Sequence, residues 1–464
     1  MSNITISEAP AENKMGVMPV NRLLFSMSLP MILSMLVQAL YNIVDSIFVA
    51  QIGETALAAV SLAFPVQNLI IAVSVGTGVG VNALLSRSLG EKNQETANLA
   101  AVNGIFVFFL SYLLFAVFGL FFARMYFSVQ TSNPEIIEQG TIYLSVCSIF
   151  SFGIFLEIAL ERIMQSTGRT IYNMITQGLG AIINIILDPI LIFGLFGFPR
   201  MGILGAAVAT VIGQILAMLL LLYFHIRKNS DVNLNMRRFR PDPAIIAELY
   251  RVGLPSIIMQ SISSVMIMVL NNILIVFSQA AVAVLGVYFK LQSFIFMPVF
   301  GLGHGSMPIM GYNFGARNKK RLVHTLKLSS TISLCIMIVG LLIFQFGAKY
   351  LLMMFNASEE MMEIGVSALR TISLCFPAAA LGISFSNFFQ AIGEGKNSLL
   401  ISVLRQLFIL LPAAWLISRI GTLNQVWLAF PIAEVFALIV RILLLKLTDK
   451  SKIHEMEYLA AEEE

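Results

Sequence analysis

Charged side chains are scarce in this sequence, and that scarcity excludes an ordinary soluble domain. Asp, Glu, Lys and Arg make up 12% of the 464 residues, and 58% are hydrophobic. A soluble domain carries roughly 25% charged residues. Many apolar stretches approach the about 20 residues that a helix needs to cross a bilayer. The sequence therefore predicts an all-α integral membrane protein.

Motifs of catalysis and of nucleotide hydrolysis are also missing. The chain contains no GxxxxGK[ST], no HExxH and no GxSxG, so it has neither an ATP motor of its own nor a recognisable hydrolase centre. The glycine runs 76–80 and 301–305 lack GxGxxG spacing and indicate close helix packing. We expect no enzyme activity and no cofactor.

The sequence has three cysteines, and none of them lies close to another along the chain. Cys147, Cys335 and Cys375 lie in apolar segments without a CxxC motif, which is typical of buried small hydrophobic side chains. The basic residues are scattered over loops instead of forming one face, so nucleic acid is not an expected partner.

Twelve apolar segments are predicted to span the membrane. Their approximate ranges are 23–49, 56–80, 98–122, 139–160, 171–194, 202–224, 253–277, 281–307, 328–348, 367–390, 398–419 and 425–447. Most of the 29 basic residues fall in loops that share a side with the N-terminus, which predicts that both termini are cytoplasmic. The first span lacks a cleavage site, so we expect it to be retained in a cell inner-membrane protein.

The two halves of the sequence resemble each other at a shift of 225 residues. Leu29-Pro30 coincides with Leu254-Pro255, Gln67 with Gln292, and the two glycine runs with each other. Shared membrane composition explains apolar coincidences but not the polar and glycine ones. Six spans in each unit make the repeats parallel, so we expect two pseudo-symmetric six-helix lobes.

The repeat divides the chain into five segments. We expect a cytoplasmic N-terminal segment 1–22, an N-lobe 23–224, a cytoplasmic linker 225–252, a C-lobe 253–447 and a cytoplasmic tail 448–464. Asp242-Pro243 predicts a helix start in the linker, and we expect that helix to lie at the membrane surface as far as Tyr250.

Two carboxylates lie deep in predicted spans and occur in one half only. Asp45 is on the first span and Asp188 on the fifth, where Asn184 shares its helix face. Pro189 cannot donate to the carbonyl of Ile185, which leaves that oxygen free. Such groups can ligate Na⁺ or hold a proton; alternatively, each carboxyl is a neutral hydrogen-bonding group between helices.

Other charged residues inside spans allow a structural or a functional interpretation. Glu157 and Glu161 are four residues apart, and pairing with Arg162 or Arg169 is the structural alternative. Lys290 is a counter-ion or gate, unless it snorkels to the interface. Arg405 and Glu434, on the last two predicted spans, can pair with each other.

These features together resemble the multidrug and toxic compound extrusion (MATE) family. Leu29-Pro30, Gln38 and Asp45, followed by Asn184 and Asp188-Pro189, are similar to its prokaryotic branch with an N-lobe acidic centre. The resemblance implies a cation site that includes Asp45, Asn184, Asp188 and Thr210, with Gln38 beside it. The span at 253–277 has no Asp or Glu, so the branch with an acidic seventh span is not matched.

The resemblance implies secondary active antiport. A monomer in the bilayer would export lipophilic or cationic drugs in exchange for H⁺ or Na⁺, and the same centre would bind Na⁺. The first alternative is a lipid-linked saccharide flippase or metabolite exporter of the same superfamily, for which a basic cavity is expected. A channel or a membrane enzyme is the second; missing catalytic motifs disfavour the enzyme, and the repeat within one chain disfavours a simple pore.

Overall fold

The structure, a computed structural model, describes residues 13–235, 239–355 and 357–448, and these residues form helices without strands. Residues 1–12 and 449–464, which include most of the expected N-terminal segment and tail, lie outside the described residues. The helices of the first half are α1 (Lys14–Val17), α2 (Val20–Ile52), α3 (Glu54–Gly90), α4 (Gln94–Phe121), α5 (Ala123–Gln130), α6 (Pro134–Ile149), α7 (Phe152–Ser166), α8 (Thr170–Phe193), the short 3₁₀ turn η1 (Leu195–Gly197) and α9 (Ile203–Lys228).

The second half repeats this order. Its elements are α10 (Pro243–Leu274), α11 (Gln279–Gly315), α12 (Lys319–Met353), α13 (Glu359–Ser373), α14 (Phe376–Ala391), α15 (Gly395–Val403), the π-helical segment η2 (Leu404–Leu410), α16 (Leu411–Ile420), α17 (Leu423–Val426) and α18 (Ala429–Thr448). We call α2–α9 the N-lobe and α10–α18 the C-lobe.

The predicted spans are present among the described residues, and two of them are bent. Ten helical stretches are long and apolar enough to cross a membrane, and two bent helix pairs bring the number to twelve. The fourth predicted span is α6 and α7, which meet at 41°, and the tenth is α13 and α14, which meet at 48°. The fold class predicted from the sequence is therefore confirmed.

The internal repeat extends to the helix ends. A shift of 225 residues carries α3 onto α11 and the start of α4 onto the start of α12. Asn93 and Asn318 cap equivalent helices by accepting a backbone N–H bond. Gly168 and Gly393 end equivalent helices with φ of 82° and 84°, a backbone conformation that favours glycine.

The linker differs from the expectation in one respect. Asp242 accepts hydrogen bonds from the N–H groups of Ala244 and Ile245, so the predicted helix start is confirmed. The helix does not end at Tyr250, however, but continues without a break to Leu274. Arg251 and then mostly apolar residues follow Tyr250, and the helix continues through Pro255, which removes one backbone hydrogen bond without ending it. The expected separate surface helix is wrong, and the other segment borders stay predictions.

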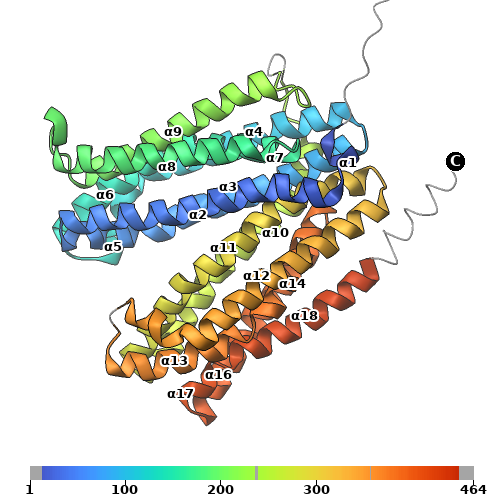
Figure 1. Cartoon of the computed structure of the whole chain (residues 1–464). Helices are drawn as coiled ribbons and strands as arrows, with labels where there is room; N and C mark the ends of the chain where they lie inside the picture. Colours follow the sequence, from blue (N-terminus) through green and yellow to red (C-terminus); the bar gives the residue numbers. More distant parts are fainter. Residues whose placement is uncertain (1–12, 236–238, 356, 449–464) are drawn as a thin grey trace, which may run out of the picture.

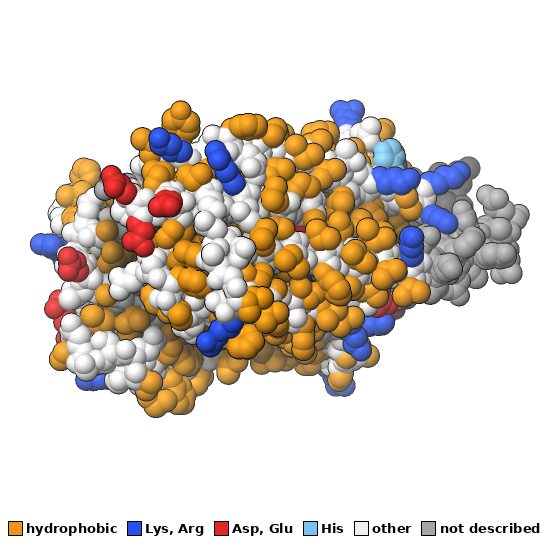
Figure 2. Space-filling model, turned by 90° about the horizontal axis from the view of Figure 1, so that it is seen from below, with side chains coloured by type: hydrophobic (Ala, Val, Ile, Leu, Met, Phe, Trp, Pro, Cys, Tyr) orange, Lys and Arg blue, Asp and Glu red, His pale blue; other side chains and the backbone are white. Residues whose placement is uncertain are grey.

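The two lobes converge at the end of the molecule near both termini and diverge toward the end that carries α5, α13 and α17 (Figure 1). We call these ends the closed end and the open end. Glycines bring the backbones together: a Cβ atom at Gly80 would overlap the carbonyl oxygen of Leu249, and one at Gly90 that of Tyr312. Figure 2 shows one face on which hydrophobic side chains cover the middle, with Lys and Arg toward the end near the termini.

Candidate functional site

Asn184, Asp188 and Thr210 meet inside the N-lobe, between α8 and α9. Asp188 is 0% exposed and Asn184 2% exposed. With its amide oriented to satisfy its neighbours, Asn184 donates to Asp188 Oδ2 at 2.8 Å and accepts from the Thr210 hydroxyl at 3.3 Å. Asn184 therefore fixes one oxygen of the carboxyl group and leaves the other free.

Asp45 completes this group from α2. Its carboxyl group lies within hydrogen-bonding reach of that of Asp188. The Oδ1 atom of Asp188 is buried and has no hydrogen-bond donor among the described residues. Two carboxyl groups at such a distance need a proton or a cation between them. The structure thus brings together Asp45, Asn184, Asp188 and Thr210, which we call the acidic centre.

A pocket of about 110 Å³ adjoins the acidic centre, lined in part by Asn184 and Thr210. Gln38 also lines it, as expected, and so does Tyr41, whose hydroxyl hydrogen-bonds to Thr210. The sequence interpretation missed Tyr41, although its position four residues before Asp45 places both on one face of α2.

Glu157 and Glu161 line the same pocket. Among the described residues, neither forms a direct ion pair with Arg162 or Arg169, although Arg162 is close enough to Glu161 to interact with its charge. Glu161 accepts a hydrogen bond from Gln177, and Arg169 pairs with Asp231. Arg162 donates to Gln165 at 3.0 Å, and its Nε has no partner among the described side chains. Gln177 was missed from the sequence, although it lies seven residues before Asn184 on α8, two helical turns away on the same face.

A larger cavity of about 670 Å³ lies between the lobes. Gln38, Glu161 and Gln177 line both it and the smaller pocket, so the two spaces adjoin. Its apolar wall includes Met31, Met35, Met259, Phe289, Phe296 and Phe300. This volume lies within the range of small-molecule binding sites.

Three charged residues of the C-lobe also line the large cavity. Glu434 accepts from Arg405 Nη1 at 3.0 Å and from Arg441 Nη1 at 2.6 Å. The expected pairing of Arg405 with Glu434 is therefore present. Arg441, which the sequence interpretation did not single out, joins them because it lies seven residues after Glu434 on α18. We call these three residues the arginine triad.

Lys290 and His304, both on α11, differ in their access to the cavity. His304 lines the cavity. Lys290 is exposed and is not among the lining residues, a position that fits snorkelling better than a counter-ion in the cavity. No group of three His, Cys, Asp or Glu side chains in the described part of the chain is arranged to hold a metal ion. The expected Na⁺ site at the acidic centre stays a prediction.

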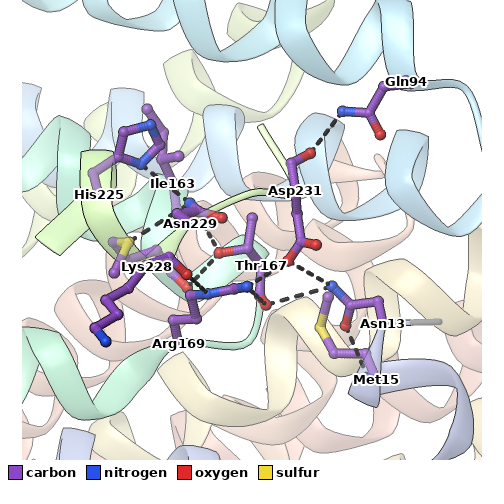
Figure 3. A network of polar contacts seen from close by, with 11 residues as sticks. Asn13, Met15, Gln94, Ile163, Thr167, Arg169, His225, Lys228, Asn229 and Asp231 are labelled. Atoms are coloured by element: carbon purple, nitrogen blue, oxygen red, sulfur yellow. Dashed lines mark hydrogen bonds and ion pairs between the residues drawn. The ribbon is translucent and has the colours of Figure 1, made fainter. Parts of the chain in front are cut away.

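Helix α1 joins the two lobes at the closed end. On the N-lobe side, Asn13 donates to the carbonyl of Thr167 at 3.4 Å and to Asp231 at 3.3 Å (Figure 3). On the C-lobe side, Arg321 donates to the carbonyls of Met15 and Met18 at 2.9 and 2.7 Å. The α1 segment is therefore a strap across the closed end.

The packing at the strap also affects the pKa of Lys14. Burial and the nearby guanidinium of Arg169 lower the pKa of Lys14 below its usual value. Arg169 itself is held by Asp231 and by the carbonyl of Lys228 (Figure 3).

The family model described as MatE matches residues 30–190 and 255–416. The chain belongs to the MatE family. The two matched regions begin 225 residues apart, the same shift that relates the two lobes. This MatE protein is a multi-pass membrane transporter and not an enzyme, as the sequence predicted.

Curated relatives of this MatE protein are similar over nearly their whole length. The "Multidrug export protein MepA" of Staphylococcus haemolyticus is 26% identical over 408 residues, which cover 88% of this chain and 89% of the relative. The "FAD transporter" of Shewanella oneidensis is 28% identical over 419 residues, which cover 90% of this chain and 92% of the relative.

Solved structures are similar in fold throughout. One described as an outward-facing conformation of a multidrug resistance MATE family transporter has a TM-score of 0.89 and 27% identity, and the similarity covers 97% of this chain and 100% of that one. A superfamily transporter from Pyrococcus furiosus, described as having a binding pocket of reverse polarity, has a TM-score of 0.88 at 27% identity.

Proposed function

We propose that this MatE transporter exports lipophilic organic cations from the cell in exchange for H⁺ or Na⁺. The observation that carries the proposal is the acidic centre, in which two carboxyl groups lie together and one buried oxygen has no donor. Such a pair binds one positive charge at a time, either the coupling ion or, through the adjoining cavity, the cargo.

The small pocket would connect the site of the coupling ion with the site of the cargo. Asn184 and Thr210 of the acidic centre line the small pocket, and Gln38, Glu161 and Gln177 continue into the large cavity. Binding of the ion at the centre would cancel the negative charge that attracts the cargo, so ion and cargo would exclude each other. The methionine and phenylalanine wall would hold the apolar body of the cargo with little directional bonding.

We further propose that the closed end faces the cytoplasm. The excess of Lys and Arg in the loops at that end supports this orientation. In this state the cavity would be open to the outside, where it releases cargo and takes up the ion. The transporter would act as a monomer in the inner membrane, since one chain contains both lobes. The relatives named multidrug export proteins support this cargo class.

The first test is ethidium efflux from energised cells that express the wild type or Asp188→Asn. We expect the variant to lose efflux by more than about tenfold, the effect of losing an interaction of about 1.4 kcal/mol. Glu363→Gln, which removes an exposed carboxylate on α13, is the matched control and should behave as the wild type. Removal of Na⁺ or addition of a protonophore identifies the ion.

Equal efflux by the wild type and Asp188→Asn at equal expression would refute coupling through the acidic centre. If the wild type moves no cationic dye under any condition, the drug-export proposal fails, and a lipid-linked or metabolite cargo becomes the better hypothesis.

A further inference from the structure

The arginine triad places an excess of positive charge in the wall of the large cavity. Two guanidinium groups share one carboxylate, so the group carries a net charge of about +1 when all three residues are ionised. Glu434 is 3% exposed and Arg441 5% exposed. An uncompensated charge at such a depth in a membrane protein costs several kcal/mol, and an anion bound beside the triad would remove that cost.

The triad also has donors that its own members leave unused. The Nε atoms of Arg405 and Arg441 are buried and have no hydrogen-bond acceptor among the described residues. Gln406, next to Arg405 in the π-helical segment η2, lines the cavity with them. Guanidinium groups bind carboxylate and phosphate oxygens through two parallel N–H bonds. Arg405 and Arg441 both line the cavity, so a rotation of their head groups would present these unused donors to such a group.

The internal repeat shows that the two lobes differ in polarity. The positions equivalent to Arg405, Glu434 and Arg441 are Gly180, Ala209 and Leu216. Conversely, the acidic residues Glu157 and Glu161 correspond to Gly382 and Ser386 in the C-lobe. Packing common to both lobes therefore does not require the triad.

Gly382 shows how the C-lobe accommodates the triad. A Cβ atom at this position would overlap the guanidinium of Arg441. The glycine thus opens the space that the Arg441 head group occupies beside Glu434. In the N-lobe the equivalent position carries the carboxylate of Glu157 instead.

We propose that the arginine triad binds an anionic group, a carboxylate or a phosphate, on the transported molecule. The acidic N-lobe wall would hold a cationic group of the same molecule, a part of the inference that rests on the proposed function. The preferred cargo is then an aromatic zwitterion or an aromatic phosphate, with its apolar body against the methionine and phenylalanine wall.

Two matched dye pairs test this on purified full-length transporter in detergent. Rhodamine 110 carries a free carboxylate, and rhodamine 123 is its methyl ester; flavin mononucleotide carries a phosphate that riboflavin lacks. We expect the wild type to bind at least one anion-bearing probe about tenfold more tightly than its partner, the ratio that corresponds to about 1.4 kcal/mol. Which pair responds distinguishes carboxylate from phosphate cargo.

Arg405→Gln and Arg441→Gln should abolish this preference and leave binding of the uncharged or esterified partner within about twofold. Arg419→Gln is the control, because Arg419 is exposed near the open end and stacks on Trp415. Should an arginine variant fail to fold, Glu434→Gln supplies the second test. The Glu434→Gln variant leaves both guanidinium groups without their carboxylate, so we expect a stronger preference for the anion-bearing probe. If the triad has only a structural role, the variant protein should lose thermal stability while the preference stays unchanged.

The outcomes separate this inference from the proposed function. Equal affinity for both members of each pair would overturn the anion site, while binding of rhodamine 123 alone would still support cation export. Loss of both partners to the same degree in Arg441→Gln would also overturn it. Binding of only the anion-bearing probes would support the triad and contradict the proposed organic-cation cargo.

Discussion

At the scale of single residues, the two lobes carry charges of opposite sign at positions whose repeat equivalents are uncharged. The N-lobe places Asp45 and Asp188 where neither has an acidic counterpart in the C-lobe. The C-lobe places Arg441 in space that Gly382 provides. Arg441 lies on the wall of the large cavity and Asp188 is buried beside the small pocket, whereas the symmetric glycines and asparagine caps lie at helix ends and helix contacts.

Gly382→Ala offers a test of this space with little effect on the fold. The three atoms nearest to the added methyl all belong to the flexible head group of Arg441, and alanine is favoured over glycine in a helix by about 0.5–1 kcal/mol. We therefore expect thermal stability within a few degrees of the wild type but loss of the preference for rhodamine 110 or flavin mononucleotide. Fluorescence titration and a thermal melt measure the two effects.

Gly286→Ala is the matched control, because no atom lies within 4 Å of the added methyl. An unchanged preference in Gly382→Ala would show that the position of the Arg441 head group does not determine anion binding.

The acidic centre was predictable from the sequence because a charged residue is unusual within an apolar span. Asp45 and Asp188 stand out for that reason. Asn184 was recognised because it shares the helix face of Asp188, and Thr210 followed only from the resemblance. Tyr41 was not recognised because an uncharged aromatic residue is ordinary in a membrane helix. Arg441 lies near the predicted end of its span, where a basic residue is ordinary too, and only its spacing from Glu434 marks it.

At the scale of helices, the repeat and the spans were predictable, and the bends were not. Hydropathy gives one continuous apolar segment for 139–160, but the structure breaks it between α6 and α7 at Phe150 and Ser151. Hydropathy does not reveal the bend, because the segments on both sides of it, α6 and α7, are both apolar. The short helix α5 was missed because its eight residues form no span.

The strap α1 is an element whose contribution can be measured. Arg321→Gln removes the donors to the carbonyls of Met15 and Met18, and each hydrogen bond from a charged group contributes about 1.5–3 kcal/mol. We expect amide hydrogen exchange in residues 14–18 to become at least about tenfold faster, as a loss of about 1.4 kcal/mol predicts. Mass spectrometry of the peptide containing α1 measures the change.

Lys320→Gln removes the exposed charge next to Arg321 and should leave this exchange unchanged. Exchange in Arg321→Gln that equals the wild-type rate would show that contacts on the N-lobe side, from Asn13, are enough to hold the strap.

At the scale of the whole molecule, the lobes approach each other mainly at the closed end. Gly80 and Gly90 meet opposite carbonyls there, and Arg87 pairs with Glu248 of the C-lobe at 2.8 Å. If transport proceeds by alternate opening of the two ends, these contacts must separate in every cycle. The closed end would then be a gate, and its ion pair would be made and broken with each molecule of cargo.

A reversible cross-link across this gate provides the last prediction. We replace Cys147, Cys335 and Cys375 by serine, introduce Arg87→Cys with Glu248→Cys, and join the two with a short bis-methanethiosulfonate reagent in liposomes. Because the reagent holds the lobes together at the closed end only, dye should still bind in the cavity while transport stops, and a reductant should restore transport. The same reagent on Arg169→Cys with Asp231→Cys, a pair within the first half of the chain, should leave transport unaffected. Transport that continues through the cross-linked Arg87–Glu248 gate would mean that cargo leaves by a route that does not require the lobes to separate at this end.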